Sequence, residues 1–145
     1  MRKIDLIILH CSASDIPIQR TAEAITELHI ASKDKYFKWG HYDTTGKAFA
    51  ACGYNYVIEP SGEIVKTRSE LLAGAHCRDF NSRSIGICLA GNREFTPMQF
   101  ASLENLVNDI KERHNLSSLD VLHHNELNTY KTCPNFNYWE EIKQK

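Results

Sequence analysis

Short apolar runs alternate with amphipathic segments along the chain, which is typical of strands and helices that pack on one another. The run "IDLIILH" is rich in branched apolar residues and predicts a buried strand over Ile4–Leu9, with His10 where the strand ends. Farther on, "TAEAITELHIAS" has apolar residues at helical spacing and predicts a helix that Thr21 caps. The run "SIGICLAG" predicts another strand over Ser84–Ala90.

The segment "GYNYVIEPSGEIVKTR" predicts a hairpin, because "PSGE" suits a turn between two short runs. In its first run Tyr54, Tyr56 and Ile58 alternate, so we expect them on one face. Before the hairpin, "KDKYFKWGHYDTTGKAFAACG" has little periodicity and many turn residues. We expect a long loop there, and long loops in compact domains are often functional.

The clearest helix follows Thr96, which can cap it, and Pro97 suits its first turn. The expected apolar face of this helix consists of Phe100, Leu103, Leu106, Val107 and Ile110. The run "LDVLHH" predicts a last strand and "NYWEEIKQK" a terminal helix. This order of strands and helices predicts an α/β fold, in which helices pack against a sheet.

The composition is that of a globular protein, and it narrows the function classes. A chain of 145 residues suits one domain, residues 1–145, with a core that needs no disulfides. The net charge of −1 argues against broad electrostatic binding to nucleic acid or to an anionic membrane. The five cysteines are odd in number and form no CxxC pair, so we expect reduced thiols and folding in the cytoplasm. The N-terminal apolar run is too short for a signal peptide, and no stretch is long enough to span a membrane.

Potential metal ligands stand at the expected ends of the first and last strands. His10 ends the first strand, His123 and His124 end the last, and Cys133 lies on the segment beyond. Imidazole nitrogens and a thiolate suit a catalytic zinc site, which has three protein ligands and one open position. Hydrogen-bonded structural histidines and an inert buried thiol are the alternative, and spacing alone leaves both interpretations open.

The chain resembles a known family through an ordered set of motifs. "IILHCSAS", "GYNYVIEPSGEI", "GAHCRDFNSRSIGICLAG", "FTPMQFASL" and "LHHNEL…KTCPNF" occur in the order seen in type-2 N-acetylmuramoyl-L-alanine amidases. That family includes the zinc amidase lysozymes of bacteriophages and the peptidoglycan recognition proteins. The resemblance extends from Ile7 to Phe136. It implies a central mixed β-sheet flanked by α-helices, with a zinc groove on one face.

The resemblance also implies one Zn²⁺ ion held by His10, His123 and Cys133. Neighbouring residues in a strand face opposite sides, which favours only one histidine of the pair as a ligand. We expect the first, His123, to bind the metal and His124 to be a structural or supporting residue. The connector from His123 to Cys133 is slightly longer than the family pattern.

The implied reaction is hydrolysis of the amide between N-acetylmuramic acid and L-alanine in peptidoglycan. Zinc polarises a carbonyl and lowers the pKa of a bound water to about 7. Lys131 is the expected partner of the developing oxyanion, because it precedes Cys133 by two residues and matches the catalytic lysine of the family. Tyr54 matches the active-site tyrosine of the family, and His76 matches a groove histidine that contacts substrate or donates a proton. A solvated lysine and a core tyrosine are the alternatives.

The expected partner is peptidoglycan or a muropeptide, with no nucleic acid, no membrane insertion and a monomeric protein. The chain would be a phage or prophage endolysin or a bacterial wall-degrading enzyme, made in the cytoplasm and acting at the wall or on cytoplasmic muropeptides. The alternatives are a module that binds peptidoglycan without cutting it, which Cys133 disfavours, and an amidase that also inhibits RNA polymerase. An insertion over residues 41–52, near the expected groove rim, puts substrate specificity in question.

Overall fold

The computed structural model describes residues 2–14, 20–31 and 52–143. Its elements, in chain order, are β1 (Leu6–Cys11), α1 (Ala22–Ala31), β2 (Tyr56–Ile58), β3 (Ile64–Lys66), η3 (Asn81–Arg83), β4 (Ser84–Leu89), α3 (Pro97–His114), η4 (Ser118–Asp120), β5 (Val121–His123), α4 (His124–Leu127) and α5 (Tyr138–Lys143). The expected loop over residues 33–53 and the insertion over residues 41–52 lie almost entirely outside the described residues.

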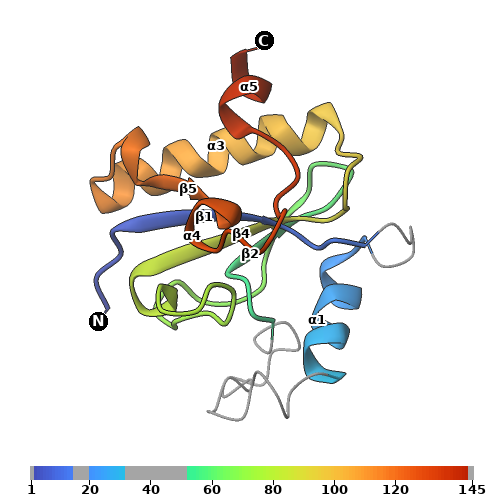
Figure 1. Ribbon diagram of the computed structural model, residues 1–145, viewed down its shortest axis with the longest axis horizontal. Helices are drawn as coiled ribbons and strands as arrows, with labels where there is room; N and C mark the ends of the chain where they lie inside the picture. Colours follow the sequence, from blue (N-terminus) through green and yellow to red (C-terminus); the bar gives the residue numbers. More distant parts are fainter. Residues whose placement is uncertain (1, 15–19, 32–51, 144–145) are drawn as a thin grey trace.

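One five-stranded sheet organises the fold, with the strand order β3-β2-β4-β1-β5 (Figure 1). Strand β1 runs parallel to β4 and β5, and β2 runs parallel to β4. Strand β3 pairs with β2 in an antiparallel hairpin, as the sequence predicted. The expected α/β fold with a mixed sheet and flanking helices is therefore confirmed.

Helix α3 covers one face of the sheet, and α5 packs beside it (Figure 1). All five predicted apolar positions of α3 are buried in the main core. The same core takes Ile7 and Leu9 from β1 and Ile85 and Ile87 from β4, which alternate along their strands. The Thr96 side chain accepts from the N–H of residue 99, so the predicted cap is confirmed.

Strand β1 begins and ends later than the sequence predicted. It spans Leu6–Cys11, because β4 continues to pair beyond the apolar run, with His10 opposite Cys88 and Cys11 opposite Leu89. His10 is therefore inside the strand and nearly fully buried, instead of following its end. The predicted cap of α1 is confirmed, since the Thr21 hydroxyl accepts from a backbone N–H of the first turn at 3.1 Å.

Two buried amide side chains connect the sheet to the segments around it. Gln99 of α3 donates to the carbonyls of Ile58 and Ala90, both at 3.0 Å, and so joins the helix to the ends of β2 and β4. Asn55 accepts from the Gly86 N–H at 3.0 Å and donates to the carbonyl of Ser69 at 3.1 Å. These bonds hold the chain after β3 against β4, and this part of the chain leads to residue 76.

The second face of the sheet carries the residues of interest. On β1, Leu6 and Ile8 point to this face, and His10 has the same parity. Tyr54 also packs on this side, against a small core that contains Val57. The expectation that Tyr54 shares a face with Tyr56 is wrong, because β2 begins only at Tyr56 and the chain bends before it.

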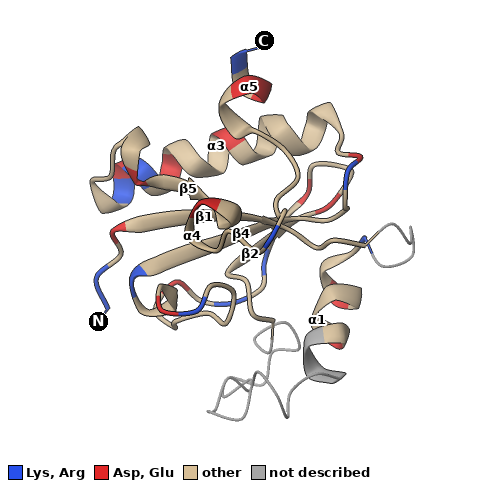
Figure 2. Cartoon of the chain, viewed as in Figure 1, with Lys and Arg blue, Asp and Glu red and all other residues tan. Residues whose placement is uncertain are grey.

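The described elements carry mixed charge and free cysteines. Acidic and basic residues are interspersed over the described elements (Figure 2). All five cysteines are free thiols. Among the described residues, no helix combines the length and apolarity needed to cross a bilayer.

Candidate metal centre

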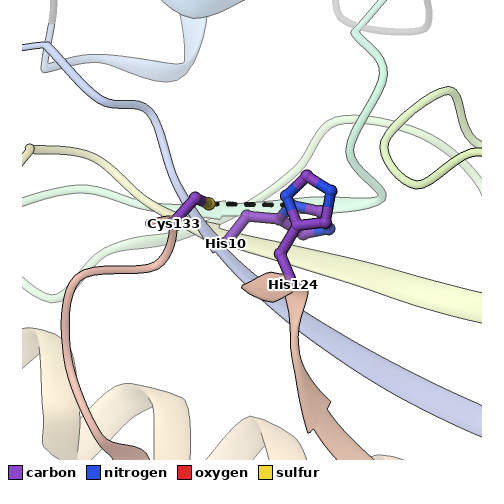
Figure 3. A group of neighbouring side chains, drawn as sticks. All are labelled: His10, His124 and Cys133. Atoms are coloured by element: carbon purple, nitrogen blue, oxygen red, sulfur yellow. Dashed lines mark hydrogen bonds between the residues drawn. The ribbon is translucent and has the colours of Figure 1, made fainter. Parts of the chain in front are cut away.

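Three potential ligands from distant parts of the chain converge at the end of β1 (Figure 3). His10 comes from β1, His124 from the first position of α4, and Cys133 from the connector before α5. One ligand atom from each lies within 4.8 Å of the others. Since β1 and β5 are parallel neighbours, their carboxyl ends meet at one edge of the sheet, where open α/β sheets commonly bind ligands.

The spacing of these atoms suits a tetrahedral zinc ion. Cys133 Sγ lies 3.9 Å from His10 Nδ1. Bond lengths of about 2.3 Å to sulfur and 2.0 Å to nitrogen place the two ligand atoms about 3.5 Å apart in a tetrahedral site. The ring centroids of His10 and His124 are 4.5 Å apart. The pair of Cys133 and His10 is therefore within about 0.4 Å of the tetrahedral spacing, and the ligand atom of His124 lies within 4.8 Å of both.

His124 provides a direct test of whether a cation fits. Its Nδ1 atom is buried and has no hydrogen-bond partner among the described residues. Burial, assisted by the positive charge of Lys131, lowers the pKa of His124, so the ring is neutral and offers a lone pair. Unpartnered buried polar atoms are rare and costly, and a metal ion would satisfy this one.

The sulfur of Cys133, the atom that would bind a cation, contacts the backbone of Cys11. Its sulfur accepts from the Cys11 N–H at 3.1 Å, which favours the thiolate. Hydrogen bonding with the Cys11 side chain and burial nevertheless raise the pKa of Cys133. Without a cation the thiol keeps its proton, and a metal ion would displace that proton on binding.

The structure does not bring His123, the expected ligand, into this group. His123 Nε2 accepts from the Tyr138 N–H at 3.0 Å, and Nδ1 donates to Glu126 at 3.0 Å. Both ring nitrogens are thus engaged on the α5 side of the sheet. His123 therefore supports the fold. His124 lies in the cluster, at the position that was expected for His123.

The sheet register explains the exchange of the two histidines. Leu9 pairs with His123, and Leu9 points into the core beneath α3. Residues paired across parallel strands share a face, so His123 points to that core and His124 follows His10 to the other face. Alternation along the strand correctly predicted that only one histidine faces the cluster. The long connector before Cys133 was the available signal, because counting from His124 shortens it by one residue.

The other predicted site residues lie around the cluster in different ways. The ring of Tyr54 is 5.1 Å from that of His10, and burial raises the pKa of Tyr54 well above its usual value. Lys131 is exposed, and its positive charge contributes to the lowered pKa of His124. His76 lies edge-on to His10, with ring centroids 4.8 Å apart.

His76 makes a direct contact with a candidate ligand, which the sequence did not predict. Its Nδ1 is 2.8 Å from Nε2 of His10. Burial, with smaller contributions from His124, Arg2 and Arg68, lowers the pKa of His76 to about 3. The ring is therefore neutral near pH 7.

Comparison with known proteins places this chain in a family. The family model described as N-acetylmuramoyl-L-alanine amidase matches residues 1–136. The endolysin of Escherichia phage T7 is 29% identical over 148 aligned residues, covering 94% of this chain and 86% of the endolysin. Peptidoglycan-recognition protein SC2 of Drosophila melanogaster is 32% identical over 106 residues, covering 71% of this chain, and the match spans 56% of that protein.

Solved structures agree on the fold. N-acetylmuramoyl-L-alanine amidase LysC from Clostridium intestinale URNW superposes with a TM-score of 0.77 at 24% identity, covering 99% of this chain and 85% of that one. Drosophila PGRP-LB superposes with a TM-score of 0.71 at 20% identity, covering 99% of this chain and 81% of that one. Because the family model matches residues 1–136, nearly the whole of this chain, the chain belongs to the N-acetylmuramoyl-L-alanine amidase family.

Proposed function

We propose that this protein is a zinc-dependent amidase that cleaves the bond between N-acetylmuramic acid and L-alanine in peptidoglycan. The observation that carries the proposal is the convergence of His10, His124 and Cys133, with a buried ring nitrogen of His124 left without a partner among the described residues. Two imidazoles and one thiolate leave a fourth position open, which is the composition of a catalytic zinc site.

When bound, zinc supplies a Lewis acid that polarises the amide carbonyl and lowers the pKa of an attacking water. The chain supplies the remaining groups. Lys131 carries a positive charge beside His124, where it can stabilise the oxyanion that develops as the amide is attacked. Tyr54 keeps its phenolic proton, because burial raises its pKa, so it can donate a hydrogen bond beside His10.

The alternative within the family is recognition of peptidoglycan without cleavage. The presence of a cysteine thiol in the cluster favours hydrolysis, because all three arms of the metal site are then available. Similarity to the T7 endolysin over most of both chains supports a role of the endolysin type, acting on the cell wall after synthesis in the cytoplasm.

The proposal is tested by measuring bound zinc and the release of new L-alanine amino termini from purified peptidoglycan. Wild type should hold one zinc ion and release amino termini. Cys133→Ala should lose both, whereas Cys77→Ala, a buried thiol outside the cluster, should keep both. Zinc binding without release of amino termini would support the recognition alternative, and absence of both would refute the proposal.

A further inference from the structure

His76 is the centre of a hydrogen-bonded chain that starts at a metal-ligand candidate and ends on the backbone. Nε2 of His10 lies 2.8 Å from Nδ1 of His76. Nε2 of His76 lies 3.3 Å from the hydroxyl of Ser84, which is fully buried. The Ser84 hydroxyl donates to the carbonyl of Phe80 at 2.8 Å.

The Phe80 carbonyl fixes the donor-to-acceptor direction of all three hydrogen bonds. A carbonyl oxygen only accepts, so the single proton of the Ser84 hydroxyl is given to Phe80. The Ser84 oxygen therefore accepts from an Nε2–H of His76. The Nε2–H of His76 is given to Ser84, and among the described residues no carboxylate hydrogen-bonds the His76 ring to hold a second proton. Nδ1 of His76 therefore holds the lone pair and accepts from an Nε2–H of His10.

This direction leaves His10 with its lone pair on Nδ1. That atom is the one that lies 3.9 Å from the sulfur of Cys133. The tautomer that can bind a cation is thus selected from the opposite side of the ring, before any cation arrives.

Two glycines hold the His76 ring in its place. A Cβ atom at Gly86 would lie 2.7 Å from ring atoms of His76, and one at Gly74 would lie 2.7 Å from its Cδ2. The backbone on both sides therefore approaches the ring closer than any side chain allows. Asn55 supports this arrangement, because its side chain accepts from the N–H of Gly86.

We infer that His76 is a positioning residue, which fixes the tautomer and orientation of His10 through Ser84, and that it is not primarily a substrate contact. This inference rests on the proposed zinc site. Outer groups that hydrogen-bond a metal-binding histidine raise its basicity, and their loss typically weakens metal binding by 10–100-fold.

The zinc dissociation constant of the full chain, measured by competition with a chromogenic chelator, tests the inference. His76→Phe fills the space between the glycines but has no acceptor, and it should weaken zinc binding about 10–100-fold. His76→Asn places a carbonyl oxygen near the position of Nδ1 and should recover most of that loss. Ser84→Ala should weaken binding about tenfold, at the lower end of the same range. The matched control is His114→Phe, since His114 contacts Glu70 instead of the cluster, and its affinity should equal that of wild type.

Nitrogen-15 spectra of the zinc-loaded protein give a second readout that a purely structural role would not move. We expect a proton on Nε2 of His10 and on Nε2 of His76, with Nδ1 of His76 unprotonated. A proton on Nδ1 of His76 would overturn the inference. If His76→Phe does not fold, Ser84→Ala decides the question through its zinc affinity.

The two proposals fail in different ways. Wild-type affinity in folded His76→Phe or Ser84→Ala, within about threefold, overturns the positioning role and leaves the amidase proposal intact. Zinc binding without amide cleavage overturns the amidase proposal, while the variant affinities still decide the role of His76. A wild-type chain that binds no zinc overturns both.

Discussion

Replacing each of the adjacent histidines by alanine should separate metal binding from stability of the fold. His123→Ala removes the acceptor of the Tyr138 N–H, and a buried unsatisfied N–H costs about 1–3 kcal/mol. The imidazole of His123 is 9% exposed, so its loss also leaves a cavity. Its bond to Glu126 adds little, because that carboxylate is 51% exposed. We expect a total loss of about 3 kcal/mol and a Tm lower by about 6–12 °C, with zinc binding retained.

His124→Ala should show the opposite behaviour. Its unpartnered Nδ1 contributes no hydrogen bond to the metal-free protein, so the metal-free Tm should change by only a few degrees. The variant loses one of three ligands, however, and should not respond to zinc. At a zinc concentration of 100 times the dissociation constant, binding stabilises a protein by about 2.7 kcal/mol. Wild type and His123→Ala should gain this stability, and His124→Ala should not.

The assay is thermal unfolding of the three proteins, each with a chelator and with excess zinc. The two variants serve as controls for one another, because they remove the same side chain from neighbouring positions. The reasoning is refuted if zinc raises the Tm of His124→Ala as much as that of wild type. It is also refuted if folded His123→Ala no longer responds to zinc.

Three further outcomes follow from single contacts. Lys131→Ala should keep zinc but lower kcat by about 10²–10³-fold through loss of oxyanion stabilisation; a change below about threefold in amide cleavage would contradict that role. Asn55→Ala leaves the N–H of Gly86 without an acceptor and should cost about 3 kcal/mol, seen as a Tm lower by about 6–12 °C; an unchanged Tm would count against it. Burial opposes ionisation of Glu70, but bonds from Arg113 and other groups prevail and lower its pKa from 4.5 to about 2. The resulting stability, about 2 kcal/mol after allowance for the exposure of Arg113, is complete above about pH 4.5 and is lost as pH falls toward 2. The stability gap between wild type and Glu70→Gln should therefore close over this range in urea unfolding, and a constant gap would exclude the linkage.

The regular elements could be predicted because local signals agreed with the tertiary structure. The cap at Thr96 and the apolar spacing behind it define α3 without reference to other segments. The branched run before His10 likewise indicates a buried strand, although pairing with β4 extends it beyond the apolar residues. Pairing partners are not visible in one stretch of sequence, so the end of β1 was misplaced.

The metal cluster was predictable only in part, for the same physical reason. His10 and Cys133 could be chosen from residue type and motif, and the structure brings them together. The choice between His123 and His124 depends on which face of β5 meets β1, and this depends on a register between strands far apart in sequence. The contact of His76 with His10 also arises from the sheet, because only the close approach of Gly86 leaves space for the ring.

The pairing of β1 with β5 places the first and last strands of the chain side by side, and this has a consequence for the order of assembly. Cys133 and His10 are 123 residues apart in sequence, so a cation between them closes one of the longest loops the chain can form. During synthesis, the segments for β1 to β4 and α3 all emerge before β5, so the cation site is completed last. Removing the cation should loosen the edge formed by β5 and α4 first, and amide hydrogen exchange there should accelerate while the centre of the sheet remains protected.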